Sequence, residues 1–486
     1  MKKLVTLLAF FTTMSLCYAQ DHQILGESDI IGTARFVGMG GAMTAIGGDP
    51  SSVVLNNPAG LGVYRSLEAM ISFGLDIDRS KQMVANGQVG TRDGVIQNIY
   101  FIPTQTSAVF AFGRDGNEGI LFNNLMISYQ RMRNWNRTYA ASLQQEPTQS
   151  IANIMAANAN QYNLPSAPTL PDMDNAAWLT YLGFKDSIID LFQESDGSYI
   201  YDICIPTDYK IGQAAIISDK GFVQQFNINY AMNVSNRFYW GLGLGIQSLS
   251  RTHTIEYAES YATSPSTTTS MSLYSYTRQT GIGVNGSIGF IYRPAQFLRL
   301  GASFITPTAM SLKTTTYGDS QAFDYQRVST STYRQTDNAF TQPMRVSASA
   351  AIQMLDRGLL SFQYDYQHHR LAKDLHSLRV GLEIVPAEGF YLNAGYAFTS
   401  HFLPLAEQPL YTFSGLSVRT DTDWSNLQSR HQASIGFGYR GAYMIAQIAY
   451  QCSIERLNVY AHELADPYDM QAFTHRVTLS LAFHSK

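Results

Sequence analysis

The chain has 486 residues, a formal net charge of −4 and only 14% charged residues, but 30 Tyr and 26 Phe. An average soluble domain is roughly a quarter charged, and the weak net charge gives no sign of a nucleic-acid partner. The mean hydropathy is −0.11, and after the first twenty residues no apolar run approaches the roughly 20 residues that a spanning helix needs. The composition therefore excludes a helical membrane bundle and favours a membrane β-barrel, in which apolar and polar residues alternate.

Residues 1–19 are interpreted as a secretory signal peptide. Lys2 and Lys3 form its positive start, an apolar run beginning LVTLLAFF follows, and Cys17-Tyr18-Ala19 supplies an acceptable cleavage site. The mature chain is therefore expected to be exported. It keeps Cys204 and Cys452, which either pair or remain free thiols; two cysteines make neither a disulfide framework nor a zinc cluster.

Residues 20–66 precede the first strand and are rich in small side chains. We expect compact turns with one short helix, begun by Asp49-Pro50-Ser51-Ser52. The glycine run from Gly38 to Gly41 is not interpreted as a phosphate loop, because Met43 breaks the G-x-G-x-x-G spacing and no strand precedes it.

From residue 67 onward, apolar and polar residues alternate with period 2, which is typical of strands with one apolar face. In residues 225–234, for example, Phe226, Ile228 and Tyr230 alternate with asparagines. About fourteen strands are predicted, at 67–79, 95–113, 120–133, 221–234, 237–258, 270–293, 296–317, 324–354, 357–370, 376–387, 389–399, 430–440, 442–456 and 472–483.

The connections between these strands are sorted by length. Every second connection is a short turn (RDGNEG, VSNR, RPAQ, LDRG, PAEG and RG), whereas the others are longer, the longest being 134–220 and 400–429. Bacterial barrels have short periplasmic turns and long outer loops. Aromatic residues beside the short turns predict a girdle at the membrane interface: Tyr239, Trp240, Tyr292, Phe297, Phe390, Tyr391, Tyr439, Tyr443 and Phe483.

The insertion at 134–220 looks least like a barrel. Within residues 175–193, apolar side chains recur at helical spacing, and they would form either an apolar lid on the outer face or a core that packs the loop against itself. The candidate ligand-contacting residues are Trp178, Leu182, Phe184, Ile189 and Phe192. His368, His369 and His376 flank a predicted outer turn and leave a metal-binding or haemin-binding role open.

The phrase VGMGGAMTAIGGDPSSVVLNNPAGLG resembles the N-terminal hatch of the FadL/TodX family of outer-membrane transporters. The resemblance is carried by Gly40 and Gly41 and, after the stretch beginning at Asp49, by Asn57, Pro58 and Ala59. It implies an all-β chain: a fourteen-stranded antiparallel transmembrane barrel with this hatch inside the lumen. The expected organisation is a signal peptide at 1–19, a hatch at 20–66 and a barrel at 67–486 with a partly helical extracellular loop at 134–220. One departure is the ending Phe483-His484-Ser485-Lys486, which places the usual terminal aromatic three residues in.

The resemblance also implies a function, namely passive uptake of a small hydrophobic molecule such as a fatty acid, an aromatic compound or another lipid. The outer loop would then be a landing surface, and the protein a monomer among outer-membrane lipids. No catalytic grouping or metal-ligand cluster can be placed in the sequence, so neither an enzyme nor a cofactor is expected. The alternatives are a barrel that binds or shuttles exported proteins, a haemin receptor, or an open diffusion porin.

Two sets of inward residues are expected to face the hatch. Strand glycines would either leave room for the hatch backbone or bend the wall, and charged side chains would hydrogen-bond the hatch or hydrate the lumen. The glycines are Gly241, Gly243, Gly245, Gly281, Gly283 and Gly289; the charged residues are Arg345, Asp365, Arg379, Glu383, Arg440 and Arg476.

Overall fold

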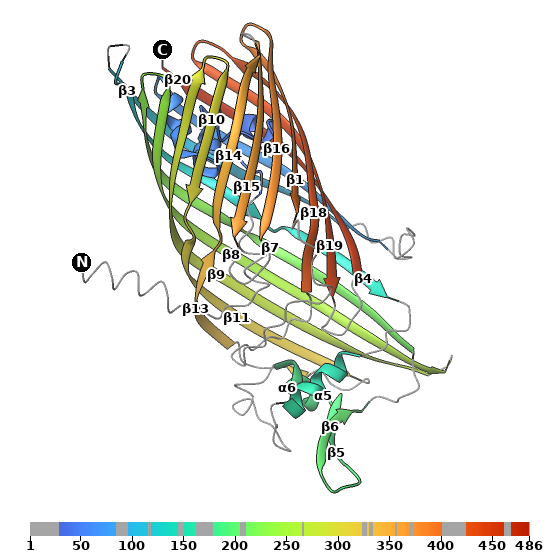
Figure 1. Ribbon diagram of the computed structural model, residues 1–486. Helices are drawn as coiled ribbons and strands as arrows, with labels where there is room; N and C mark the ends of the chain where they lie inside the picture. The colour runs from blue at the N-terminus through green and yellow to red at the C-terminus, as the bar shows by residue number, and fades with distance from the viewer. Residues whose placement is uncertain are drawn as a thin grey trace, which may run out of the picture.

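The structure is a computed structural model, and its strands form one closed, tilted barrel (Figure 1). It describes residues 29–83, 96–114, 116, 118–143, 150–161, 178–204, 210–264, 267–322, 328–329, 334–354, 357–368, 374–400, 424–460 and 468–485. The predicted signal peptide lies outside the described residues.

The wall consists of fourteen antiparallel strands, as the sequence predicts. Consecutive strands pair around the wall, and the first pairs with the last from Glu68 opposite His484 to Met83 opposite Asp469, which closes the barrel. The uninterrupted wall strands are β1 (Glu68–Met83), β2 (Ile96–Gly113), β3 (Ile120–Asn134), β7 (Lys210–Val234), β8 (Phe238–Ser264), β9 (Thr267–Ala295), β15 (Gly358–His368), β16 (Leu375–Ala387), β17 (Phe390–Ser400), β18 (Trp424–Arg440), β19 (Met444–Tyr460) and β20 (Tyr468–His484).

The two remaining wall strands are each interrupted by a proline. One consists of β10 (Leu298–Ile305) and β11 (Thr308–Ala322), and the other of β13 (Arg334–Gln342) and β14 (Met344–Met354). Pro307 and Pro343 stand at these breaks, because proline cannot donate a hydrogen bond to the neighbouring strand. The short β12 (Val328–Ser329) pairs with the end of β11.

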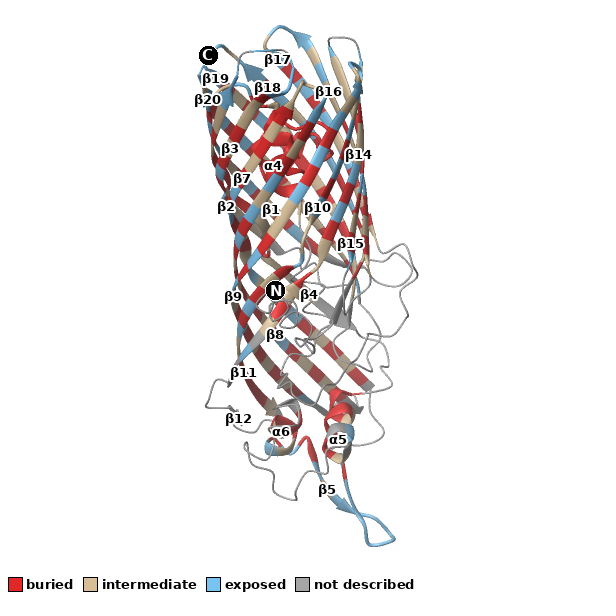
Figure 2. Cartoon of the chain, turned by 60° about the vertical axis from the view of Figure 1, so that its left-hand side comes forward, coloured by how far each residue is buried: buried red, intermediate tan, exposed pale blue. Residues whose placement is uncertain are grey.

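Buried and exposed residues alternate along the wall strands (Figure 2), and the period-2 pattern places apolar side chains outside and polar ones inside. On β7, Phe226 and Ile228 are each 55% exposed, whereas Asn227 and Asn229 are buried in the lumen. The closed hydrogen-bonded wall and its apolar outer surface suit a bilayer, where backbone groups must be paired internally. No helix in the described part of the chain is long and apolar enough to span a membrane.

Short connections gather at one end of the barrel and longer ones at the other, which confirms the predicted sorting. The girdle prediction is correct for the aromatics that are exposed at the short-turn end, among them Phe297 and Phe483. It is wrong for Tyr239 and Tyr391, which are buried. The pleat is the reason: each stands next to an outward residue and therefore points into the lumen.

Residues 29–66 lie inside the barrel near the short-turn end (Figures 1 and 2). They form α3 (Ala34–Gly38), α4 (Pro50–Leu55) and the 3-10 helix η1 (Pro58–Val63). Asp49 caps α4 by accepting a hydrogen bond from the Ser52 amide at 3.0 Å, so the predicted helix begins where expected. The helix α3 was not predicted; Thr33 caps it.

The outer insertion contains strands and a further helix that its pattern does not predict. It comprises β4 (Arg137–Leu143), α5 (Ile151–Gln161), α6 (Trp178–Lys185) and the hairpin β5 (Ile189–Gln193) with β6 (Tyr199–Ile203), and β7 already begins at Lys210. The expected helical run over 175–193 is wrong beyond Lys185. Ser187 adopts a positive φ of 55°, which ends the helix, and the β-branched pair Ile188-Ile189 then enters an extended hairpin.

Candidate functional site

The N-terminal segment, residues 29–66, approaches the wall at strand glycines. A Cβ at Gly241 would lie 2.5 Å from the Pro58 carbonyl, and one at Gly289 would lie 1.8 Å from the Asn57 side chain. For these two glycines the expected contact with the segment is correct. Three further wall glycines, not singled out in the sequence, lie equally close to its backbone: Gly301, Gly381 and Gly395.

The other four predicted glycines serve a different purpose. Gly243 and Gly245 make room for side chains of neighbouring strands, such as those of Asn229 and Gln225. Gly281 and Gly283 lie against Met310 and the backbone of β11. These glycines relieve crowding inside the wall and do not contact the N-terminal segment.

The hatch-like motif forms the turns of this segment. Gly40 and Gly41 have φ of 61° and 71°, a region that favours glycine. Asn57 caps η1 and donates hydrogen bonds to Thr44 O at 2.8 Å and Phe290 O at 3.0 Å. Pro58 starts η1 and Ala59 is fully buried. The residues of the motif thus shape and cap the backbone turns of the segment, which explains why they are small, amide-bearing or proline.

Charged wall residues hold the segment in place. Arg345 donates to the Leu55 carbonyl, and Arg379 donates to the Gly41 carbonyl at 3.4 Å. Glu383 binds Arg35 through two bonds of 2.7 and 2.9 Å. Asp365 instead pairs with Arg379 at 3.0 Å, and Arg440 lines a cavity at the short-turn end.

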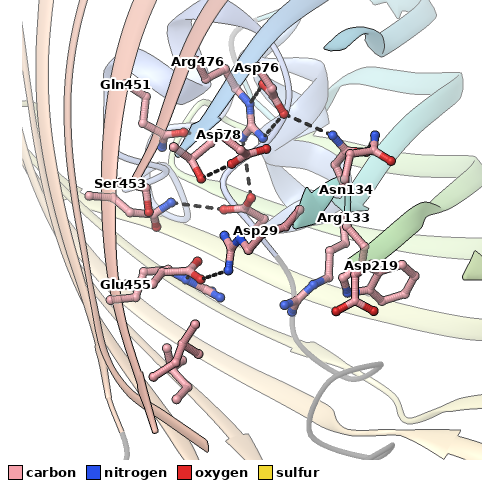
Figure 3. Close-up of a pocket in the computed structure, with 18 residues that line it drawn as sticks. Asp29, Asp76, Asp78, Arg133, Asn134, Asp219, Gln451, Ser453, Glu455 and Arg476 are labelled. Carbon is pink, nitrogen blue, oxygen red and sulfur yellow. Dashed lines mark hydrogen bonds and ion pairs between the residues drawn. The ribbon is translucent and has the colours of Figure 1, made fainter. Parts of the chain in front are cut away.

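On the outer side of the segment the lumen contains a charged chamber (Figure 3). Five carboxylates and four arginines line it, together with a few apolar groups such as Trp135. The charged lining residues are Asp29, Asp76, Asp78, Asp219, Glu455, Arg133, Arg137, Arg430 and Arg476. A chamber of this chemistry suits a polar or ionic group and is a poor environment for a pure hydrocarbon.

Ion pairs cross this chamber from strand to strand and reach the N-terminal segment (Figure 3). Arg476 on β20, only 2% exposed, binds Asp76 on β1 at 2.7 and 2.8 Å and donates to the Ile30 carbonyl at 3.0 Å. Glu455 on β19 accepts from Arg430 at 2.6 Å and from Arg137 on β4 at 2.7 Å. The network fixes the start of the segment against the wall.

Beside the chamber, β2 and β3 part. Their pairing runs from Gly113 opposite Phe122 to Gln105 opposite Gln130, while β2 stays paired with β1 as far as Ile96. The register of β1 with β2 shifts at Pro103, so this proline marks a bulge.

The N-terminal segment forms hydrogen bonds with the edge of β3 that β2 leaves unpaired. The Asp29 amide donates to the Met132 carbonyl at 3.2 Å, and the Gln130 side chain donates to the Ile31 carbonyl at 2.8 Å. Beyond β3, β4 approaches β1 from the lumen, because the inward Ser80 hydroxyl donates to the Thr138 carbonyl at 2.6 Å. Asp29 to Ile31 therefore stand where the wall divides.

Buried polar atoms without a protein partner gather at the same place. Among the described residues they include both side-chain polar atoms of Gln105, the Thr104 hydroxyl, and two guanidinium nitrogens of Arg131. An unpaired buried polar group costs about 1–3 kcal/mol. This division of the wall is therefore suited to water or to the polar group of a ligand.

The candidate ligand-contacting residues of the outer loop do not form one surface. Leu182 and Ile189 are buried, and Phe184 packs edge-on against Tyr201, with ring centroids 6.1 Å apart. Of the candidates whose side chains are described, only Phe192 is well exposed, at 44%; Trp178 is the first residue of α6. Ile188 and Ile189 join a core with α5 and the inner faces of β7 to β9, so most of the loop packs against itself and the wall.

One buried carboxylate fixes this loop. Glu259 on β8 is 1% exposed and accepts hydrogen bonds from Ser150 Oγ at 2.5 Å and the Ile151 amide at 2.9 Å, at the start of α5. Tyr257 and Tyr261 also donate to it. The loop is thus anchored by a charged cap inside an apolar core.

The cysteines and histidines form no joint site. Cys204 and Cys452 are both free thiols, so they do not pair. His376 binds the Tyr364 hydroxyl at 2.7 Å and His368 binds Asp374 at 2.9 Å, while His369 lies outside the described residues. No group of three or more metal-ligating side chains occurs in the described part of the chain.

Most of the chamber residues were not identified from the sequence. Asp76 and Asp78 occupy inward positions of a predicted strand, so the alternation could have identified them. Asp29 and Arg137 lie outside the predicted strands, and nothing in the sequence relates them to Arg476 or Glu455.

No family model and no curated protein matches the chain. Solved structures do match, and three of them cover 94% of this chain and 99% of their own at 12% identity. They are a Pseudomonas aeruginosa FadL homologue (TM-score 0.56), the CymD monoaromatic hydrocarbon channel (0.53) and the Pseudomonas putida toluene transporter TodX (0.51). The chain therefore has the fold of the FadL/TodX proteins, as the N-terminal motif implied. With the apolar outer surface, this fold supports the predicted location in the outer membrane.

Proposed function

We propose that this protein is an outer-membrane channel for passive uptake of small hydrophobic molecules that carry a polar group. The N-terminal segment acts as the plug of the barrel, and the molecule leaves sideways between β2 and β3. The observation that carries this proposal is the parting of the two strands beside a chamber whose direct route inward is occupied by residues 29–66.

The shared fold supports the substrate class, because two of the similar structures are described as a hydrocarbon channel and a toluene transporter. The charged chamber favours, within this substrate class, molecules that carry a polar head. Such a head would satisfy the unpaired groups near Thr104 and Gln105, while the apolar part of the molecule stays toward the membrane. Passage between the strands would then release the apolar part directly into the bilayer.

To test the lateral route, a disulfide would fix the start of the N-terminal segment to the edge of β3. In a Cys204→Ser, Cys452→Ser background, the pair Asp29→Cys and Met132→Cys can form a disulfide, since the backbones of these residues are already hydrogen-bonded at 3.2 Å. The matched control is Ser107→Cys with Ser128→Cys, which are directly opposite within the paired part of β2 and β3.

Uptake of radiolabelled oleate, toluene and glucose would be measured in bacteria that lack their own transporter. We expect oleate uptake to fall when the first pair is oxidised, to recover on reduction, and to be unaffected by the control pair. Unchanged oleate uptake in the oxidised protein would refute the lateral route. Equal entry of glucose would indicate an open porin.

A second function, binding exported proteins at the outer face, is favoured by one observation. The hairpin of β5 and β6 projects from the outer end (Figure 1) and exposes Phe192, Tyr199 and Ile200, at 44%, 63% and 38%. Exposed apolar side chains of this kind can mark a protein contact. Under this alternative, Phe192→Ser with Tyr199→Ser would change the set of surface proteins and leave oleate uptake intact.

A further inference from the structure

A second cavity lies on the opposite side of the N-terminal segment, at the short-turn end. It has a volume of about 460 Å³. Its wall residues stand at strand ends: Arg299 is the second residue of β10, Arg440 the last of β18, and His484 the last of β20. In bacterial barrels this end faces the periplasm. No residue in the described part of the chain lines both this cavity and the charged chamber.

The lining of this cavity has an excess of positive charge. Four arginines (Arg35, Arg65, Arg299 and Arg440) face two glutamates (Glu68 and Glu383), which gives 4 − 2 = +2 with His484 neutral. The bidentate pair of Arg35 with Glu383, at 2.7 and 2.9 Å, removes one charge of each sign. The remaining glutamate cannot neutralise three arginines.

Arg299 is the cation that most lacks compensation. Its side chain points inward, on the same face of β10 as Gly301, and donates to the Ile46 carbonyl at 3.1 Å. Its Nε is buried and has no partner among the described residues. The charge that acts most strongly on it is that of Arg293, which is also positive. A half-buried guanidinium in this situation favours a bound anion.

The rest of the lining indicates what kind of anion fits. Arg65 is directed to the neighbouring turn, where it donates to Asn236 and lies 4.7 Å from the centre of the Phe122 ring. The same lining includes five apolar residues: Ile46, Val63, Leu359, Val385 and Ile445. A lining with both cationic and apolar side chains suits a small amphiphile with an anionic head.

We propose that this periplasmic cavity binds the carboxylate or phosphate head of a small amphiphile, with Arg299 as the principal ligand-binding residue and Arg440 beside it. The site lies beyond the N-terminal segment. It does not depend on the lateral route proposed above, because binding at this cavity is measured without transport.

Binding would be measured with the purified full-length mature protein in a neutral detergent, by isothermal titration with octanoate, octyl phosphate, octanamide and inorganic phosphate. We expect octanoate and octyl phosphate to bind and octanamide not to bind. Arg299→Gln should weaken octanoate about 10- to 100-fold, as expected for loss of a charged hydrogen bond. Arg299→Lys should retain part of the affinity.

The matched control is Arg114→Gln, which removes an exposed arginine of the turn between β2 and β3, outside the cavity lining, and should leave octanoate affinity unchanged. If inorganic phosphate bound as tightly as octyl phosphate, the inference that the ligand is an amphiphile would be overturned, and the cavity would be a site for free anions. Octanamide binding as well as octanoate, or full affinity in a folded Arg299→Gln protein, would overturn the whole proposal.

Discussion

Replacing Arg476 by methionine tests whether the ion-pair network holds the barrel together. Arg476 and Asp76 are 2% and 1% exposed, so solvent screens their interaction very little. Removing one partner of such a pair leaves a buried charge unpaired and costs about 3–5 kcal/mol. At about 1.4 kcal/mol per tenfold change, the folded-to-unfolded ratio should fall by roughly two to three and a half orders of magnitude.

The assay is equilibrium unfolding in guanidinium, followed by tryptophan fluorescence, with the electrophoretic shift on heating as a second readout. Arg476→Met with Asp76→Asn should recover most of the loss, because neither charge is then left alone. The control is Arg456→Met on the neighbouring strand, an exposed arginine whose loss should change stability by no more than about 0.5 kcal/mol. A loss below about 1 kcal/mol in Arg476→Met, or no recovery in the double variant, would refute the reasoning.

Three further outcomes are expected. Gly395→Val should displace the N-terminal segment and expose it to protease, because a Cβ at Gly395 would lie 2.1 Å from its backbone, whereas Gly286→Val, with nothing nearer than 3.8 Å, should not. Burial raises the pKa of the Cys204 thiol, so in a Cys452→Ser protein iodoacetamide should react more slowly than with free cysteine at pH 7.5 and speed up as the pH rises; rapid labelling at neutral pH would contradict this. Glu259→Ala should quicken hydrogen exchange of the α5 amides about 10- to 100-fold, and unchanged protection would mean that the carboxylate does not anchor the loop.

The barrel could be predicted from the sequence because each strand carries its own pattern. Alternation such as that of Phe226 and Ile228 with asparagines is set by the two sides of the wall, apolar lipid and polar lumen, and needs no distant partner. The cap at Asp49 is equally local. By contrast, the strands around β7 to β9 extend beyond their predicted ends, because outside the bilayer polar residues are tolerated on both faces.

The site could be predicted only in part. The hatch-like motif is a local backbone feature and was recognised, whereas the contact of Asp29 with Met132 joins residues more than a hundred positions apart. The helical spacing around Ile189 was misleading, since a positive φ at Ser187 interrupts it and the same apolar residues fill a hairpin and a core. The alternation of apolar and polar residues shows which side chains face the lumen, but it does not show which of them another segment of the chain covers.

The unequal lengths of the strands make the wall much taller on one side. With 29 residues at about 3.3 Å each and a tilt near 40°, β9 rises roughly 70 Å, whereas the apolar band of a bacterial barrel is only about 25 Å tall. Strands β15 to β17, of 11 to 13 residues, extend little beyond that band. Roughly 45 Å of β9 therefore stands beyond the apolar band, so antibodies or phages that approach from outside meet this strand tip well before they reach the lipid.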